Sequence, residues 1–227
     1  DVLRHKKPVG KTVAVIGAGG IGFDVSEYLL HAGHSTSLDK ASFFAEWGVD
    51  TTGTSRGGLA PANLGEVPRK IYLLQRKASK VGDGLGKTTG WIHRTGLKNK
   101  GVEMIPGVQY RKVDDAGLHI TVGDKDMTLP VDNVIVCAGQ DPNRELQAAL
   151  EAQGVRVHLI GGADKAAELD AKRAIWQGTE LALRMDPTAA APAQATPGAT
   201  HQAPPAVQAS LAAWHAMVAA GDLSNLP

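Results

Sequence analysis

The chain has 227 residues, of which 43% are hydrophobic and only 4% aromatic, and it contains 27 glycines. This balance favours an α/β protein with many tight turns over an aromatic-rich β-sandwich, and the length allows one full domain and part of another. The net charge of +1 argues against nucleic acid or an anionic membrane as partner, and the single cysteine, Cys137, excludes an internal disulfide or an all-cysteine iron–sulfur site.

The residue pattern near the start of the chain predicts a strand, a glycine turn and a helix. Residues 1–10 are polar and are expected to form an N-terminal linker; the chain begins without Met, which suggests a piece of a longer protein. Residues 12–16 are apolar and β-branched, as is typical of a strand buried on both faces. The glycine-rich stretch 17–22 follows, and residues 23–31 have apolar side chains at helical spacing, with Gly33 as the expected C-cap.

The middle of the chain begins with a long segment that has no regular pattern, and further strands and a helix are expected after it. Residues 34–69 carry turn signals and one helical patch at 43–47, and a connection of this length is usually functional or mobile. A second buried strand is expected at 71–74, a helix at 88–99 and a third strand at 102–105. Three further strands with hairpin-like turns between them are expected at 108–113, 118–122 and 127–129.

The last part of the chain predicts two more strands and a long helix. A buried strand at 134–137 is followed by a strand at 155–160, and a helix is expected from Lys165 to about Arg184. This order predicts an α/β fold: a Rossmann-like dinucleotide-binding domain with a β-meander, plus part of a second domain. An Ala/Pro-rich linker is expected at 187–208, because it has no Asp, Glu, Lys or Arg and few large apolar side chains.

Several classes of function receive no support from the sequence. No stretch approaches the roughly 18 consecutive apolar residues of a membrane span, and no signal peptide opens the chain, so a cytoplasmic location is expected. The histidines show no metal-ligand spacing, and no nucleophile–base signature is present, so we predict neither a metal site nor a catalytic residue in this chain.

The glycine fingerprint is the strongest functional signal. Gly17 permits the tight turn after the strand, Gly19 lets the backbone approach a pyrophosphate, and Gly22 lets helix and strand pack closely. The helix that follows presents the N–H groups of its first turn, including those of Gly20 and Ile21, to the phosphates. Any glycine-rich turn can match the pattern, but its place between a strand and a helix favours dinucleotide binding over a merely structural turn.

The residues after the second strand indicate which dinucleotide binds. NAD sites usually place an acid there for the ribose 2′-hydroxyl, whereas a 2′-phosphate requires Arg or Lys. Residues 75–80 contain no acid and three cations, Arg76, Lys77 and Lys80. NADPH is therefore the expected cofactor, and the alternative is a basic strand end that only faces solvent.

Two other patterns leave alternatives open. Residues 84–88 (GLGKT) lack the first glycine of a P-loop, because Val81 stands in its place, so a nucleotide triphosphatase is not favoured. Asp164, which follows two glycines at the expected start of a helix, is either a plain N-cap or an acceptor for a sugar hydroxyl. Cys137 is expected to be a buried structural thiol.

A series of motifs extends from residue 1 to about residue 185. They are IGAGGIGFD (16–24), LLQRKASK (73–80), GLGKTTGWIHR (84–94), IPGVQY (105–110), VIVCAGQDPNR (134–144) and HLIGGADKAAELDAKRAI (158–175). Together these motifs closely resemble the C-terminal end of the bacterial NADPH-dependent 2,4-dienoyl-CoA reductases, multidomain flavoproteins of the old yellow enzyme group.

The resemblance implies a domain organisation and a reaction. It implies an NADPH-binding domain at 11–130, with the insert 34–69, and a returning part of an FAD-binding domain at 131–186. NADPH would pass a hydride to FAD, for reduction of 2,4-dienoyl-CoA-like substrates in a barrel domain. The residues that would line the flavin are Ala138, Gly139, Gly162 and Asp164.

The sequence also departs from that family. The barrel, the cluster cysteines and the first FAD fingerprint are absent, so FMN, the 4Fe–4S cluster and the rest of the FAD site are expected in upstream domains, and the acyl-CoA substrate is an indirect partner. Residues 211–227, within the segment 209–227, resemble over a short stretch the start of a nuclear-transport-factor-two-like (SnoaL-like) domain. The competing hypothesis is a non-catalytic NADPH-binding module or sensor fused to such a small-ligand-binding domain.

Overall fold

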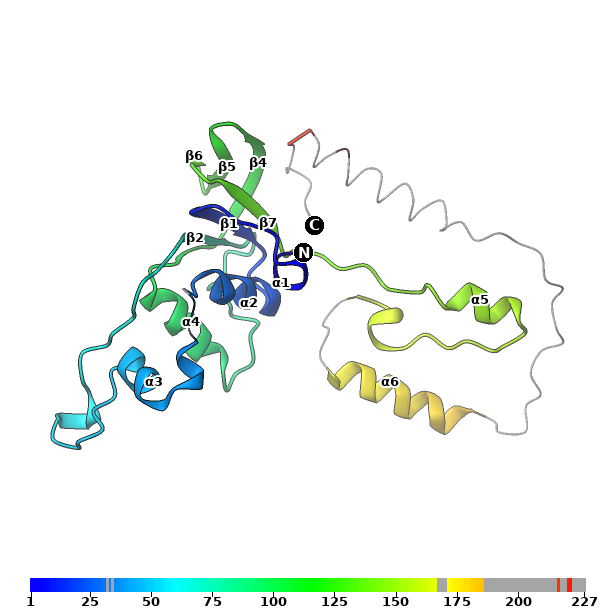
Figure 1. Cartoon of the computed structure of the whole chain (residues 1–227). Helices are drawn as coiled ribbons and strands as arrows, with labels where there is room; N and C mark the ends of the chain where they lie inside the picture. The colour runs from blue at the N-terminus through cyan, green and yellow to red at the C-terminus, as the bar shows by residue number, and fades with distance from the viewer. Residues whose placement is uncertain (32, 34, 167–170, 186–215, 217–219, 222–227) are drawn as a thin grey trace. The chain divides into compact units, whose positions relative to one another are not determined.

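The computed structural model describes residues 1–31, 33, 35–166, 171–185, 216, 220 and 221. These residues form two compact units, one built on Asp1–Ala138 and the other beginning at Gly139 (Figure 1). The predicted NADPH domain ends earlier, at residue 130, and its assignment stays a prediction. The predicted linker 187–208 and the segment 209–227 lie outside the described residues, apart from 216, 220 and 221.

A four-stranded parallel sheet forms the centre of the first unit. Its strands lie in the order β3 (Glu103–Ile105), β2 (Lys70–Leu74), β1 (Thr12–Ile16) and β7 (Asn133–Val136). Alternate side chains of β1 point to opposite faces: Val13 and Val15 belong to one core cluster, and Ala14 and Ile16 to the other. All four are at most 1% exposed, which explains why this strand is a continuous apolar run.

Two helices cover one face of this sheet. They are α2 (Gly20–Leu29) and α4 (Gly90–Asn99). Phe23 and Leu29 of α2 and Leu97 of α4 pack in the same cluster as Val13 and Val15. The helix α2 begins earlier than the apolar spacing predicted, and the backbone of Leu30 caps its end in place of Gly33.

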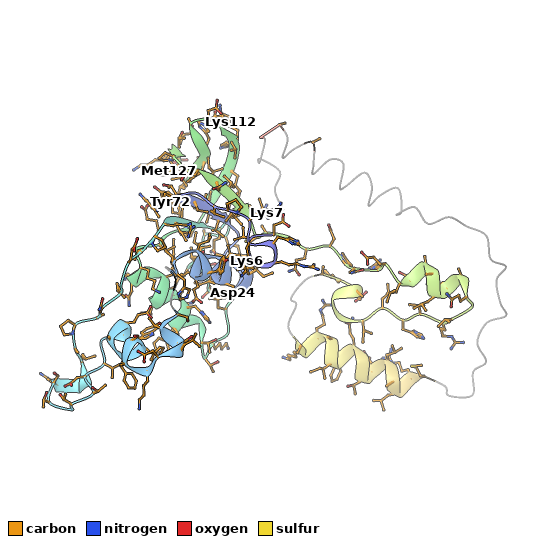
Figure 2. All side chains as sticks on the ribbon, viewed as in Figure 1. Lys6, Lys7, Asp24, Tyr72, Lys112 and Met127 are labelled. Atoms are coloured by element: carbon orange, nitrogen blue, oxygen red, sulfur yellow. The ribbon has the colours of Figure 1, made fainter. Side chains whose placement is uncertain are left out.

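An antiparallel meander covers the other face. Its strands are β4 (Val108–Asp114), β5 (Gly117–Val122) and β6 (Lys125–Leu129). Tyr110 and Ile120 of the meander share a buried cluster with Tyr72 of β2, and Figure 2 labels Tyr72 with Lys112 and Met127 of the meander. Helices, parallel sheet and meander therefore form three layers, which confirms the predicted Rossmann-like α/β fold with a β-meander.

The long insert folds as a small lobe. It contains α3 (Lys40–Trp47), whose first turn is capped by Asp39, and a bridge between Val49 and Leu59. Glu46 of α3 forms an ion pair with Lys100 after α4, with 2.7 Å between Oε1 and Nζ. The two side chains are only 13% and 16% exposed, so this pair ties the lobe to the helical layer.

Removal of this ion pair is expected to destabilise the chain. Lys100→Met should lower the free energy of unfolding by about 1–3 kcal/mol, because it leaves the carboxylate of Glu46 partly desolvated without its partner. Urea unfolding measures the loss, with the exposed Lys98→Met as the matched control. An equal effect of the two substitutions would contradict a stabilising role for the pair.

The same pair predicts a dependence of stability on pH. Burial raises the pKa of Glu46, but hydrogen bonds from Lys100 and Thr36 and the charge of Lys100 outweigh it, so the pKa is lower than usual. A lowered folded pKa means that the ionised carboxylate stabilises the fold above the unfolded pKa and that this contribution is lost as pH falls through the folded pKa. The difference in the free energy of unfolding between wild type and Lys100→Met should therefore shrink as the pH is lowered from neutral to about pH 2.

The second unit contains α5 (Gln147–Ala152), a 3-10 turn at Gly161–Ala163 and α6 (Ala171–Arg184). The predicted strand at 155–160 is wrong: the segment pairs with no strand, because the described part of this unit offers none. The predicted helix start at Lys165 is also wrong, since Lys165 and Ala166 are not helical. The carbonyl groups of Gly161 and Lys165 instead accept hydrogen bonds from the side chain of Arg173.

The predicted N-terminal linker is partly ordered. It contains one helical turn, α1 (Val2–His5), and Nζ of Lys6 lies 4.4 Å from the ring centre of Tyr28 on α2. Figure 2 labels Lys6 beside Lys7. Among the helices of the described ranges, none has the length and apolar character needed to cross a membrane.

Candidate functional site

The carboxyl ends of neighbouring parallel strands coincide at one edge of the central sheet. The amide of Gly17 donates to the carbonyl of Leu74 at 2.9 Å, and the amide of Cys137 donates to the carbonyl of Ile16 at 2.7 Å. The chain runs from β1 to β2 and β3 on one side and returns to β7 on the other side of β1. Open α/β sheets bind ligands outside the strand ends at such a switch point.

The four glycines of the turn after β1 differ in what surrounds them. Gly17 has φ +106°, and a Cβ there would lie 2.6 Å from the carbonyl oxygen of Cys137. A Cβ at Gly22 would lie 1.8 Å from the carbonyl oxygen of Gly17, so α2 packs on the strand end only without a side chain. These geometries agree with the turn and packing roles predicted for Gly17 and Gly22.

The other two glycines face open space. A Cβ at Gly19 or at Gly20 would meet no atom within 4 Å, and both residues are exposed. Gly19 is the N-cap of α2, and no side chain of the described residues caps this end of the helix. The first-turn N–H groups of a helix have no intrahelical acceptor, so those of the exposed residues Gly20 and Ile21 are available to a ligand there. An uncapped helix end beside open space fits a pyrophosphate.

The predicted cations lie at the end of β2, the strand next to β1. Arg76, Lys77 and Lys80 are all exposed in the loop 76–80, which we call the basic loop. Burial raises the pKa of the Tyr110 hydroxyl on β4, and the positive charge of Arg76 partly opposes that shift. The structure thus places the three cations in one exposed loop beside the strand that carries the glycine turn.

One residue that the sequence reasoning missed holds this loop. The side-chain nitrogen of Gln75 donates to the carbonyl of Lys77 at 3.0 Å and to that of Ser79 at 2.6 Å. The carbonyl of Lys77 also accepts from the amide of Gly107, at 3.0 Å. The only sequence signal for Gln75 is its position directly between the apolar strand and the cations.

The glycine-rich loop before α4 lies against α2 and is not a P-loop. A Cβ at Gly82 would lie 2.6 Å from the ring of Phe23, and Nη1 of Arg94 donates to the carbonyl of Gly82 at 2.8 Å. Lys87 and Thr88 of the same loop are exposed. The structure therefore brings this loop close to the helix that follows the glycine turn.

Cys137 lies at the end of β7 and is half-buried against the helical side of the core. Burial raises the pKa of its thiol to about 11, so the thiol is neutral at physiological pH. This agrees with a structural thiol, although the side chain is less buried than predicted. Within the described ranges, no group of three or more His, Cys, Asp or Glu side chains is arranged to hold a metal ion.

The residues predicted to line a flavin fall in both units. Ala138 ends the first unit, and Gly139, with φ +78°, begins the second. Asp164 caps the 3-10 turn that contains Gly162, so the prediction that Asp164 opens the long helix is wrong. Its carboxylate accepts a hydrogen bond from Gln177 at 2.9 Å. A flavin contact for these residues stays a prediction.

Comparison with known proteins places this geometry in a family. The family model described as pyridine nucleotide-disulphide oxidoreductase matches residues 1–177. A solved structure of 2-naphthoyl-CoA reductase with 2-naphthoyl-CoA is 20% identical with a TM-score of 0.54, over 82% of this chain and 23% of that one. Histamine dehydrogenase from Rhizobium sp. 4-9 is 16% identical with a TM-score of 0.53, over 90% of this chain and 26% of that one. The chain thus spans about a quarter of the length of these two proteins, with which it shares a fold. It belongs to the pyridine nucleotide-disulphide oxidoreductase family.

Proposed function

We propose that this chain is the pyridine-nucleotide end of a flavin-dependent oxidoreductase, which binds NADPH and passes its hydride to FAD. The observation that carries the proposal is the open, uncapped helix end at Gly19 and Gly20, next to a strand whose end bears the basic loop. The pyrophosphate binds the first-turn amides of α2, and Arg76, Lys77 and Lys80 bind the 2′-phosphate.

In this proposal, the role of the chain's own residues is to bind the nucleotide and to orient it. When bound, the nicotinamide supplies a hydride and the flavin accepts it, so the protein has to place the rings and exclude water. Gly17 and Gly22 keep the turn tight against the strand, and the basic loop selects the nucleotide. Hydride transfer between the two rings requires no general acid or base, which is consistent with the neutral thiol of Cys137.

The finer part of the proposal concerns the substrate and the partners. The motifs at 16–24, 134–144 and 158–175 support a 2,4-dienoyl-CoA-like enoyl substrate, reduced in a barrel domain that is not in this sequence. Upstream domains would then supply FMN, the 4Fe–4S cluster and the first half of the FAD site. Ala138, Gly139, Gly162 and Asp164 would contribute the remaining part of that site.

Flavin binding tests this proposal. The chain alone should bind FAD at least about a hundredfold more weakly than it does with the upstream FAD half added in trans, because several charge-assisted contacts to the pyrophosphate are missing, each contributing about 1.5–3 kcal/mol. Addition of that half should also start NADPH oxidation with a dye acceptor. A chain that is yellow with stoichiometric FAD when purified alone would contradict the incomplete site, and no oxidation after reconstitution would contradict the flavoenzyme.

A second candidate is a non-catalytic NADPH-binding module or sensor. It is favoured by the second unit, where Gly161 is the one buried residue of the described part and the carboxylate of Asp164 is already bound by Gln177. In the described part of this unit, the carboxylate predicted to contact the flavin therefore already has a partner. NADPH binding without any oxidation in the reconstituted mixture would support this candidate over the enzyme.

A further inference from the structure

The side chain of Gln75 lies at the centre of the basic loop. Gln75 follows the last residue of β2 and is half-buried, whereas residues 76–80 are exposed. Its side-chain amide has two hydrogens. The nitrogen donates to the carbonyl of Lys77 at 3.0 Å and to that of Ser79 at 2.6 Å, with the hydroxyl of Ser79 at 3.4 Å. The loop therefore curls around a single amide group, and both hydrogens of that amide are used by main-chain carbonyls.

The main chain of Gln75 is fixed as well. Its amide donates to the carbonyl of Ile105 at 3.1 Å, and its carbonyl accepts from the amide of Val108 at 3.0 Å. Between these two partners lies Gly107, with φ +69°, whose amide donates to the carbonyl of Lys77 at 3.0 Å. The main chain of Gln75 is thus fixed to the ends of β3 and β4, and its side chain holds the basic loop in place.

An anchored loop matters because its three cations repel one another. A free loop of this composition would spread its charges, whereas a phosphate is bound best by donors that converge on it. Order that exists before binding reduces the entropy lost when the ligand arrives. Gln75 has no charge, and its amide hydrogens already have partners, so its effect on the phosphate is indirect.

We propose that Gln75 is a positioning residue that holds the basic loop in shape for the 2′-phosphate and thereby sets the preference for NADPH over NADH. This inference rests on the proposed function. Because NADH lacks the 2′-phosphate, a change at Gln75 should act on one nucleotide and not on the other.

The test measures the dissociation constants of NADPH and NADH for the full chain and for Gln75→Met. Methionine keeps the length of the side chain and removes both donors. The ratio of the NADH to the NADPH dissociation constant should fall by about tenfold, with NADH affinity changed by less than about twofold. Gln147→Met is the matched control, since Gln147 is also half-buried and also donates from its side-chain amide, to Glu151 on α5, and it should change neither constant. Thermal unfolding is followed for all variants.

The outcomes separate this inference from the proposed function. If the wild type prefers NADPH and Gln75→Met keeps that preference, the positioning role is wrong and the NADPH site stands. An equal loss for both nucleotides also overturns the positioning role, because it shows a general structural effect. If the wild type does not prefer NADPH, the proposed cofactor is wrong and this inference is overturned with it.

Discussion

Gly19→Ala is expected to abolish most nucleotide binding without loss of stability. Gly22→Ala is expected to lower the stability of the fold instead. A Cβ at Gly19 meets no protein atom within 4 Å, so folding should be unaffected. The same methyl group occupies the space through which a pyrophosphate approaches the amides of α2, and affinity for NADPH should fall by at least about a hundredfold. Fluorescence titration with NADPH and thermal unfolding measure the two effects.

Gly22→Ala provides the contrast, and another helix glycine provides the control. A Cβ at Gly22 would lie 1.8 Å from the carbonyl oxygen of Gly17, so this variant should lose about 3 kcal/mol of stability or more. In Gly96→Ala, on α4, the Cβ meets nothing within 4 Å, and both binding and stability should stay close to wild type or improve slightly. A Gly19→Ala chain that binds NADPH as tightly as wild type would show that the nucleotide does not use this turn.

Arg76→Ala is expected to weaken NADPH binding about 10- to 150-fold and to leave NADH binding nearly unchanged. A charge-assisted hydrogen bond contributes about 1.5–3 kcal/mol, and about 1.4 kcal/mol corresponds to a tenfold change in affinity. Both dissociation constants are measured by calorimetry, and Arg56→Ala, in the insert, is the control. Equal affinities of the unmutated chain for the two nucleotides would rule out a 2′-phosphate site in the basic loop.

Local patterns in the sequence were enough to predict most of the first unit. The strand at 12–16 and the turn at 17–22 are defined by residues that are adjacent in the chain, and glycine is required at Gly17 by its φ and at Gly22 by contact. The meander was predictable because its segments have the composition of strands, and its first strand, β4, alternates buried and exposed residues from Val108 to Arg111. Its two connecting turns also carry glycine.

Features that depend on distant residues were not predictable. The ion pair between Glu46 and Lys100 joins the insert to the end of α4, which lies far from it in the sequence, and the local pattern around neither residue indicates a partner. The segment 155–160 has the composition of a strand, but a strand also needs a neighbour, and the described part of the second unit has none. Composition alone therefore gave a wrong strand.

In the candidate site, too, some residues were predictable from local patterns and others were not. The cations of the basic loop were visible as residue types, because the position after a second strand has a known meaning for a 2′-phosphate. The role of Gln75 was not visible, since a glutamine beside cations has no pattern of its own. Its bonds to Lys77 and Ser79 appear only when the loop is folded. Asp164 was misplaced because two preceding glycines suggested a helix start where the chain forms a 3-10 turn.

A crystal structure of the chain grown with NADP⁺ tests the central claim most directly. The pyrophosphate is expected on the first-turn amides of α2, above Gly19 and Gly20, and the 2′-phosphate against the side chains of the basic loop. The hydrogen bonds from Gln75 to the loop should be retained. A nucleotide bound elsewhere, or bound here with its adenine ribose turned away from Arg76 and Lys77, would contradict this claim.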